Sequence, residues 1–251
     1  MSCSEPNAQN LPRDPPYRRC FIAPPGRTLV KGDYSQIELR IAALIADDTR
    51  MIAAFRAGDD LHALTASLVL GKPLAEVTKA DRQLAKAVNF GLLCGQRANG
   101  FRRYAQSNYG LNLSEQQADA YRTAFFRAYP GLAKWHQRVH RRHATETRTL
   151  SGRRRVLKPD IWDTDRLNSP VQGAGADGLK LALAMLWERR HQCPGAFPVL
   201  VAHDEIVVET DAAQADAAAD WLKSAMVDAM QPMLDPVAVE VEIKIAPTWG
   251  G

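Results

Sequence analysis

The sequence predicts an α+β fold in which a small antiparallel sheet carries a large helical insertion. One apolar strand segment, "RTLVKGD", stands near the N-terminus, whereas "FPVLVA", "EIVVET" and "VAVEVEIKIA" stand near the C-terminus. Between these two groups, about 130 residues have apolar positions at the three- and four-residue spacing of helices. Because strands must lie beside one another, both ends of the chain are expected to meet in one sheet.

The N-terminal strand is expected to lead directly into a helix. Ser35 followed three residues later by Glu38 fits a capping box. The apolar stripe of this helix consists of Ile37, Ile41, Leu44 and Ile45. The same periodicity predicts helices over 49–57, over 61–70, over about 78–92, and over most of 114–143 with a break near Pro130.

The C-terminal third is predicted to return to the sheet. In "TLSGRRRVL" we expect a hairpin with its turn at Ser151-Gly152, followed by a helix over 175–191. "FPVLVA" and "EIVVET" form a second predicted hairpin, whose turn contains His203 and Asp204. A long helix over 212–230 follows. The last strand is predicted from the alternation of Val237, Val239, Val241, Ile243 and Ile245.

Composition excludes several classes of protein. The 251 residues, 46% hydrophobic and 24% charged, suit one large globular domain or two small ones. No apolar run approaches the roughly 18 residues needed to cross a bilayer, and the N-terminus lacks the apolar core of a signal peptide, so no membrane partner is expected. Without a CxxC pair, free thiols in a reducing compartment are expected of Cys3, Cys20, Cys94 and Cys193.

Positive charge is concentrated in one stretch. Residues 134–158 hold nine of the 32 Lys and Arg but only Glu146 of the 28 acidic residues, which leaves 23 basic against 27 acidic residues elsewhere. A local basic stretch in a slightly acidic chain indicates a polyanionic partner such as nucleic acid. A solvated basic face is the alternative.

The first group of candidate functional residues consists of carboxylates at strand ends. Asp33 ends the N-terminal strand, and Asp204 and Glu205 stand at the apex of the predicted C-terminal hairpin. Carboxylates brought together at a buried sheet repel unless a cation lies between them, and oxygen ligands alone favour Mg²⁺ or Mn²⁺. Two such ions can stabilise a phosphoryl displacement. The alternative is that Asp204 forms a turn and Asp33 caps a helix.

The second group lies on one helix face. Arg82, Lys86 and Phe90 are spaced by four residues, so they drift by only about 40° per step around the helix. Two cations followed by an aromatic ring suit a triphosphate and a stacked base. The alternative is an exposed basic face with Phe90 in the core.

A third pattern, His136, His140 and His143, has the spacing of a zinc site on one helix face. There is no HExxH sequence, and Arg138, Arg141 and Arg142 surround the histidines with positive charge, which opposes a cation. A DNA-facing or solvated surface is the expected role.

These segments together resemble family A DNA polymerases. "GDYSQIELRIAA" resembles motif A, "RQLAKAVNFGLLCG" motif B and "VAHDEIVVE" motif C. "QNLPR", "DDLHALTA", "YPGLAKW", "TLSGRRR" and "RLNSPVQGAGADGLK" also match in the expected order, so the resemblance extends over residues 4–249. It implies a palm made of 1–38 and 166–251 and a fingers insertion over 39–165.

The resemblance also implies which partners and segments to expect. Primer–template DNA and deoxynucleoside triphosphates would be the partners. The thumb of this family lies N-terminal to the matched region, so the thumb and an exonuclease are expected to be absent here or supplied elsewhere. The protein would act in the cytoplasm at the nucleoid, or in a host cytoplasm if a phage or plasmid encodes it.

Catalytic roles are implied residue by residue. Asp33 and Asp204 would hold two Mg²⁺ ions, or Mn²⁺, together with the backbone carbonyl of Tyr34. Glu205 would lie close by in an auxiliary role. Lys86 would protonate the leaving pyrophosphate.

Substrate contacts are implied in the same way. Arg82 and Lys86 would contact the triphosphate, Phe90 would pack on the sugar and base, and Glu38 would crowd the 2′ position and so select deoxynucleotides. Gln36 and His62 complete the nucleotide site, His62 near the phosphates. Contacts to primer–template would come from Arg166, Asn168, Gln172 and His203. Cys94 stands near the template base, where the family usually has tyrosine.

The function that follows is a template-directed DNA polymerase core. The primer 3′-OH would attack the α-phosphate of the nucleotide and release pyrophosphate. The alternative is a truncated, catalytically weak fragment that binds nucleic acid without a thumb. Glu38 argues against a single-subunit RNA polymerase, and the basic helix face of Arg82 and Lys86 argues against a metal nuclease.

Overall fold

The computed structural model describes residues 11, 15–142, 144–158 and 160–251. The chain divides into two compact units. The first, called here the sheet unit, consists of the residues up to Ile37 together with 175–235 and 239–251. The second, the helical unit, consists of 38–174 and 236–238. One helix, α9 (Asp163–Glu188), contributes residues to both.

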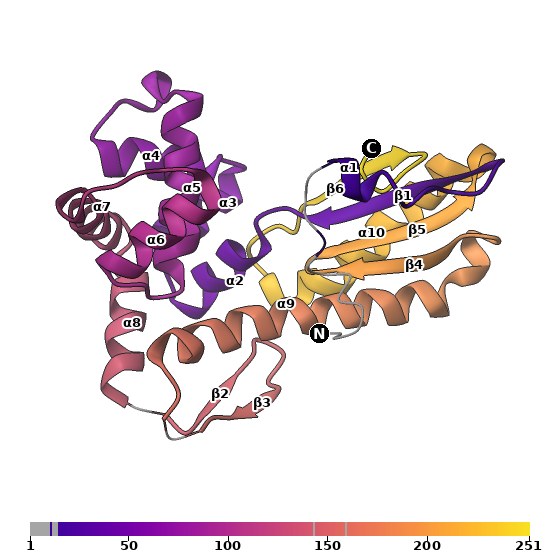
Figure 1. Cartoon of the computed structure of the whole chain (residues 1–251). Helices are drawn as coiled ribbons and strands as arrows, with labels where there is room; N and C mark the ends of the chain where they lie inside the picture. Colours follow the sequence, from indigo (N-terminus) through magenta and orange to yellow (C-terminus); the bar gives the residue numbers. More distant parts are fainter. Residues whose placement is uncertain (1–10, 12–14, 143, 159) are drawn as a thin grey trace. The chain divides into compact units, whose positions relative to one another are not determined.

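The sheet unit is built on four antiparallel strands in the order β4-β5-β1-β6. Their bounds are β1 Arg27–Tyr34, β4 Phe197–Ala202, β5 Glu205–Asp211 and β6 Val241–Ala246. The N-terminal strand β1 therefore lies between two strands from the C-terminal part of the chain (Figure 1). This confirms the predicted α+β fold.

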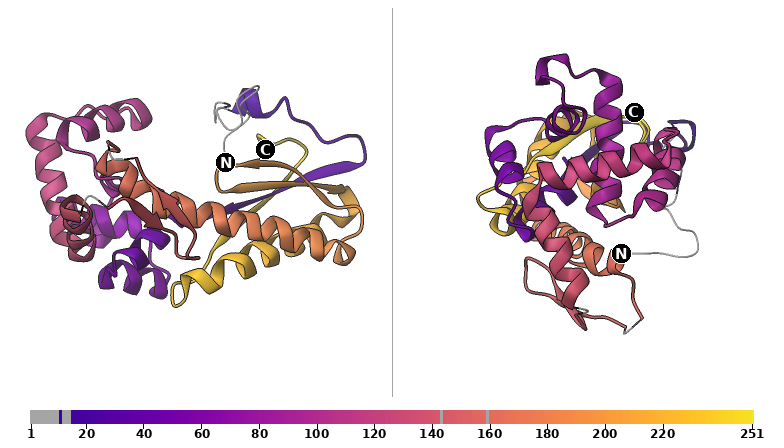
Figure 2. Two further views of the ribbon diagram at one scale, coloured as in Figure 1. Left: turned by 90° about the horizontal axis from the view of Figure 1, so that it is seen from below. Right: turned by 90° about the vertical axis from the view of Figure 1, so that its left-hand side faces the viewer.

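Two different cores cover the faces of this sheet. Helix α10 (Ala215–Leu234) lies along one face (Figures 1 and 2), where the Tyr34 hydroxyl donates to the Met226 carbonyl at 2.7 Å. Gly32 of β1 lies under the side chains of α10, because a Cβ there would lie 2.6 Å from the Met226 sulfur. The second core is a small buried cluster made of Leu29, Ala202, Val207 and Trp249. The short helix α1 (Pro15–Arg18) and the 3₁₀ turns η3 (Arg190–Gln192) and η4 (Ala212–Gln214) complete the unit.

The helical unit contains seven further helices and a short hairpin among its described residues. The helices are α2 Ile37–Ile45, α3 Thr49–Ala57, α4 Leu61–Leu70, α5 Lys79–Leu93, α6 Ala98–Tyr109, α7 Glu115–Ala128 and α8 Pro130–Arg142. The remaining elements are the 3₁₀ turn η2 (Leu74–Glu76) and the strands β2 (Glu146–Arg148) and β3 (Arg154–Val156). The predicted break near Pro130 is confirmed, because α7 ends at Ala128.

Capping residues place several of these helices. Thr78 and Asp81 form a capping box at the start of α5. Asp48, which is buried, caps α3 by accepting from the Met51 amide at 3.1 Å, and its second oxygen accepts from the Gly131 amide of α8 at 2.8 Å. One carboxylate thus joins the starts of two helices, where the helix dipoles favour negative charge.

Two predicted boundaries are wrong. Helix α9 begins at Asp163 instead of 175 and contains Pro170. Leu167, Val171 and Ala174 are buried on this stretch, and their burial offsets the backbone bond that proline removes. The last strand begins at Val241 because β1 ends opposite it, at Tyr34, and offers no partner to the preceding residues.

Other observations concern the expected environment of the chain. None of the helices in the described part is long and apolar enough to cross a membrane. Cys20, Cys94 and Cys193 are free thiols, and Cys3 lies outside the described residues.

Candidate active site

The sheet unit brings the predicted metal-binding residues together at one end of its central strands. Asp33 faces Glu205 in the register of β1 and β5, and the Tyr34 amide donates to the Asp204 carbonyl at 3.2 Å. Asp204 lies in the two-residue turn between β4 and β5, where His203 has a left-handed φ of 56°. Both aspartates are partly exposed. A short turn and strand pairing therefore position this end of the sheet through main-chain hydrogen bonds.

The donor set at this end suits a hard cation. Asp33 and Asp204 offer carboxylate oxygens, and the Tyr34 carbonyl belongs to the same backbone junction. Mg²⁺ is commonly held by one or two carboxylates and keeps other positions for water and substrate phosphate. No group of three or more His, Cys, Asp and Glu side chains suited to a metal is found among the described residues. A cation here would therefore complete its coordination with backbone, water or phosphate oxygens.

Glu205 has a different environment from the two aspartates. It is 4% exposed, and its carboxylate lies 3.1 Å from the Lys31 ammonium and 3.6 Å from the Arg18 guanidinium. The Trp249 indole donates a hydrogen bond to its other oxygen. Its charge is balanced within the sheet unit, so Glu205 needs no metal ion as a counter-charge. The alternation of Lys31 with Asp33 could have indicated the first partner from sequence, but nothing local pointed to Trp249.

The helical unit carries the second group of predicted residues on α5. Arg82, Lys86 and Phe90 are all partly exposed. The Arg82 Nε lies 2.5 Å from an Asp60 oxygen, and the other Asp60 oxygen caps α4 by accepting from the His62 amide at 3.0 Å. Burial raises the pKa of Asp60, but the hydrogen bonds from Arg82 and from the α4 amides bring it below its usual value. The Arg82 guanidinium is therefore anchored to the N-terminus of α4.

His62 lies at the same helix terminus. It is 3% exposed, and burial together with the nearby Arg82 charge lowers its pKa to about 4, so the ring is neutral at neutral pH. Its ring centroid lies 5.7 Å from that of Phe90, and its Nδ1 lies 2.8 Å from the Asn89 amide nitrogen. The structure thus places His62 beside Arg82 and Phe90, although 20 or more residues separate it from them in sequence.

A further group of predicted residues gathers where α5 ends. Burial, together with the nearby Glu38 carboxylate, raises the pKa of the Cys94 thiol to about 12, and the thiol is hydrogen-bonded to Asn168. Tyr104 of α6 lies in the same surroundings, where burial and the neighbouring Tyr109 raise its pKa. Glu38, Cys94 and Asn168, predicted for different contacts, are therefore neighbours, and no sequence pattern pointed to Tyr104 beside them.

The other predicted DNA contacts differ in exposure. Gln172 and His203 are exposed, whereas Arg166 is 4% exposed and donates to the Ala144 carbonyl. Gln36 adopts a left-handed φ of 53°, and its side-chain oxygen is buried with no hydrogen-bond partner in the structure. The structure therefore leaves Gln172 and His203 accessible to a macromolecule and commits Arg166 to the protein.

The basic stretch is only partly available to an external anion. Arg148 and Arg154 both pair with Glu146, at 3.2 Å and 3.5 Å, and Arg155 donates to the Ser169 hydroxyl at 2.5 Å. The side chains of Arg141 and Arg142 at the end of α8 are exposed. Part of the positive charge of this stretch is thus paired with groups of the protein itself.

The histidine pattern divides between separate surroundings. His136 packs against Phe126 with ring centroids 5.0 Å apart, and burial lowers its pKa to about 4. His140 lies 2.7 Å from an Asp163 carboxylate oxygen. His143 lies outside the described residues. His136 and His140 thus have different surroundings, although their helical spacing suggested one shared site.

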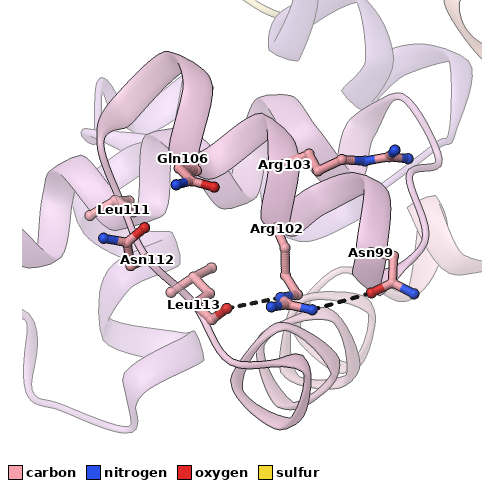
Figure 3. Close-up of a pocket in the computed structure, with 7 residues that line it drawn as sticks. All are labelled: Asn99, Arg102, Arg103, Gln106, Leu111, Asn112 and Leu113. Atoms are coloured by element: carbon pink, nitrogen blue, oxygen red, sulfur yellow. Dashed lines mark hydrogen bonds between the residues drawn. The ribbon is translucent and has the colours of Figure 1, made fainter.

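The helical unit also contains a cavity of about 570 Å³ that none of the predicted residues line. It lies between α6 and the segment that follows it (Figure 3). The Arg102 guanidinium crosses to this segment and donates to the Leu113 carbonyl at 2.9 Å, while Arg103 extends away from it. Its lining residues are Asn99, Arg102, Arg103, Gln106, Leu111, Asn112 and Leu113.

The predicted residues therefore fall into two sets. The sheet unit holds Asp33, Tyr34, Gln36, His203, Asp204 and Glu205. The helical unit holds Glu38, His62, Arg82, Lys86, Phe90, Cys94, Arg166, Asn168 and Gln172. The carboxylates predicted to bind a cation thus belong to the sheet unit, and Arg82 and Lys86, predicted to bind a phosphate, belong to the helical unit.

Comparison with known proteins identifies the family. The family described as DNA polymerase family A matches residues 1–251. DNA polymerase I of Aquifex aeolicus is 42% identical over 255 residues, covering 99% of this chain and 43% of that protein. The thermostable DNA polymerase I of Thermus aquaticus is 36% identical over 265 residues, covering 99% of this chain and 30% of that protein.

A solved structure agrees with these relatives. It is described as the POL domain of Pol1 from M. smegmatis in complex with DNA primer-template and dNTP. It matches with a TM-score of 0.84 and 30% identity, covering 99% of this chain and 45% of that one. The chain spans less than half the length of each of these proteins. This chain belongs to DNA polymerase family A.

Proposed function

We propose that this chain is the catalytic core of a template-directed DNA polymerase, with the sheet unit as its palm and the helical unit as its fingers. The observation that carries this proposal is that Asp33 and Asp204 meet at the end of two paired strands in a family A chain. The structurally similar M. smegmatis domain is described as bound to DNA primer-template and dNTP, which supports the same ligands here. The predicted palm limits were 1–38 and 166–251 and the fingers 39–165, whereas the compact units divide after Ile37 and after Ala174.

The sheet unit supplies the cation site of the proposed reaction. Asp33, Asp204 and the Tyr34 carbonyl would hold two Mg²⁺ ions, or Mn²⁺. When bound, such ions activate the primer 3′-OH and stabilise the charge on the attacked phosphate and on the leaving oxygen. Glu205, through its contacts with Lys31 and Trp249, holds the strand end on which this site is built.

The helical unit supplies the nucleotide site. Arg82 and Lys86 would bind the triphosphate, and Lys86 would give a proton to the departing pyrophosphate. The contact of Arg82 with Asp60 fixes the direction of its guanidinium before a substrate arrives. Phe90 would pack on the nucleotide and His62 would donate a hydrogen bond to its phosphates.

The remaining predicted residues would recognise the sugar and the DNA. Glu38 would exclude a 2′-hydroxyl, and Gln36 would complete the nucleotide site. Gln172 and His203, which are exposed, would contact primer–template. A further DNA contact is assigned to Asn168, and Cys94 would lie near the template base, whereas Arg166, which is 4% exposed and donates to the Ala144 carbonyl, is not proposed as a direct contact. Primer–template DNA and deoxynucleotides would be the partners of the chain, and a DNA substrate would place the protein in the cytoplasm of its cell or host.

The second candidate function is a nucleic-acid-binding fragment with weak synthesis. The relatives whose names give the polymerase activity are proteins of which this chain spans 43% and 30%. Binding without efficient chain extension would be the property of such a fragment.

Primer extension with four deoxynucleotides and Mg²⁺ tests the first proposal. Asp204→Asn is expected to reduce extension about 10³-fold or more, because several kcal/mol of charge stabilisation would be lost. The matched control is Asp211→Asn, at the other end of β5, where the carboxylate pairs with Arg27 at 2.7 Å. That control is expected to extend primers at the parent rate.

Two outcomes would contradict the polymerase proposal. Equal extension by the parent and Asp204→Asn would exclude the assigned cation site. No extension by the parent, with duplex DNA still bound, would favour the fragment instead.

A further inference from the structure

A continuous polar network runs through the core of the helical unit behind the proposed nucleotide site. The Asn89 amide nitrogen lies 2.8 Å from His62 Nδ1, and the Asn89 oxygen lies 3.0 Å from the Thr65 hydroxyl. The Thr65 hydroxyl in turn lies 2.7 Å from the Tyr129 hydroxyl. All four side chains belong to buried residues, so this chain of contacts is shielded from water.

The chemistry of each group indicates which atom donates and which accepts in these hydrogen bonds. An amide nitrogen can only donate, so His62 Nδ1 accepts and the ring hydrogen is on Nε2. The Thr65 hydrogen is shared between the Asn89 oxygen and the Leu61 carbonyl, which lies 2.8 Å away. Because the Thr65 hydrogen is used in these two contacts, the hydrogen of the 2.7 Å contact between the two hydroxyls has to come from Tyr129. With the Asn89 oxygen accepting from Thr65, the Asn89 amide nitrogen is the end that faces the histidine.

The surroundings of His62 favour a neutral ring. The charged groups that act on it are Asp60 at the start of its own helix and Arg82 and Lys86 on α5. Burial and the two cations both disfavour a proton on its free nitrogen. A neutral imidazole with its hydrogen on Nε2 can donate to an anion without taking up a proton.

We propose that Asn89 is a positioning residue that, held by Thr65 and Tyr129, fixes His62 in the Nε2–H tautomer as a neutral hydrogen-bond donor to the triphosphate. This inference rests on the proposed nucleotide site. It adds three residues to that site, none of which touches the nucleotide. A buried network of this kind can hold one geometry because every member has a partner.

The tautomer can be measured without any substrate. Nitrogen-15 spectra of the histidines in the full chain, with His62→Gln to assign the signal, report which ring nitrogen carries the hydrogen. The parent is expected to show His62 with Nε2 protonated and Nδ1 unprotonated at pH 7.5. Asn89→Leu is expected to yield a mixture of tautomers. A parent His62 with its hydrogen on Nδ1 would overturn the proposal, whether or not the chain extends primers.

A double-mutant cycle separates positioning from simple packing. Asn89→Ala is expected to raise KM for the deoxynucleotide about tenfold with little change in kcat, because one hydrogen bond to a charged group is lost. In a His62→Ala background, Asn89→Ala is expected to have no further effect on KM. An equal tenfold effect in both backgrounds would mean that Asn89 only stabilises the core.

Thr65 provides a matched pair of variants. Thr65→Ser keeps the hydroxyl and is expected to keep both the tautomer and KM, whereas Thr65→Val keeps the shape and is expected to change both. The reverse order would overturn the network. If the parent chain fails to extend primers, the role toward the triphosphate fails with the proposed function, and the spectra alone decide whether Asn89 sets the tautomer.

Discussion

The sheet unit and the helical unit place their functional groups by different physical means. In the sheet unit, Asp33 and Asp204 are positioned by strand register and by a two-residue turn, and both remain partly exposed. In the helical unit, His62 is positioned by buried side chains from other helices. Backbone pairing specifies the first arrangement, and a side-chain network specifies the second.

This difference implies unequal sensitivity. A backbone junction at the end of a sheet tolerates changes in the side chains around it, because the hydrogen bonds that define it are between main-chain groups. A buried network fails when one member loses its partner or gains a proton. We therefore expect pH and small changes in packing to affect the helical unit more than the sheet unit.

Acid is expected to produce the largest effect on stability. Burial lowers the pKa of His62 from 6.5 to about 4, so the unfolded chain binds a proton at pH values where the folded chain does not. The stabilising effect of the neutral ring is complete above pH 6.5 and is lost as the pH falls toward 4. The loss amounts to about 3 kcal/mol from His62, and His136 changes in the same direction.

Denaturant unfolding between pH 7.5 and pH 4 measures this loss. His62→Gln, which cannot bind the proton, is expected to show a smaller change than the parent. Asp81, whose pKa is lowered to about 2 by its hydrogen bonds with Thr78, acts only at lower pH and does not confuse the comparison. A parent that is equally stable at pH 7.5 and pH 4.5 would contradict the assignment of a neutral buried histidine.

Two glycines provide a packing comparison of intermediate size. A Cβ at Gly131 in the helical unit would lie 2.6 Å from the backbone Cα of Asp48, which cannot move without disturbing α3. A Cβ at Gly32 in the sheet unit would lie 2.6 Å from the flexible end of Met226. We expect Gly131→Ala to lower the free energy of unfolding by about 3 kcal/mol and Gly32→Ala by about 1 kcal/mol.

Thermal and denaturant unfolding of the two alanine variants would decide the order. Alanine also has a higher helix propensity than glycine. If the backbone near Asp48 shifts and relieves the clash, Gly131→Ala is therefore expected to be about as stable as the parent. Gly32→Ala proving more harmful than Gly131→Ala would show that the sheet unit is the less adaptable of the two.

The smallest effect concerns DNA binding by the basic stretch. Affinity for duplex DNA is expected to fall as salt rises, with a logarithmic slope of about 0.9 for each phosphate contact. Arg142→Gln is expected to reduce this slope by up to that amount. Arg148→Gln is the control, because the Arg148 guanidinium lies 3.2 Å from the Glu146 carboxylate. A binding constant unchanged across a salt titration would refute the role of this stretch.

Much of the fold and of the candidate site followed from local sequence patterns. The period of apolar residues located most of the helices, and the two short apolar segments around His203 and Asp204 predicted the hairpin that the structure contains. The spacing of Arg82, Lys86 and Phe90 placed them on α5. These features depend on neighbours within a few residues, so the chain specifies them wherever it folds.

Features that depend on distant contacts could not be predicted in this way. The alternation from Val237 to Ile245 indicated a longer strand than β6, because the end of β1 limits where pairing begins. The helix predicted over 175–191 begins at Asp163 and continues through Pro170, because buried side chains on that stretch stabilise it. The contacts of Glu205 with Lys31 and Trp249 join residues far apart in the chain, and no local pattern indicated Trp249.

The sequence by itself determined the element types, the family resemblance and the identity of the groups that we propose bind a cation or a phosphate. Only the tertiary structure decided the environment of those groups: which carboxylate is neutralised, which histidine stays neutral and which arginine is committed to the protein. The physical reason is that burial and charge depend on residues far apart in the chain, whereas periodicity depends on residues close together.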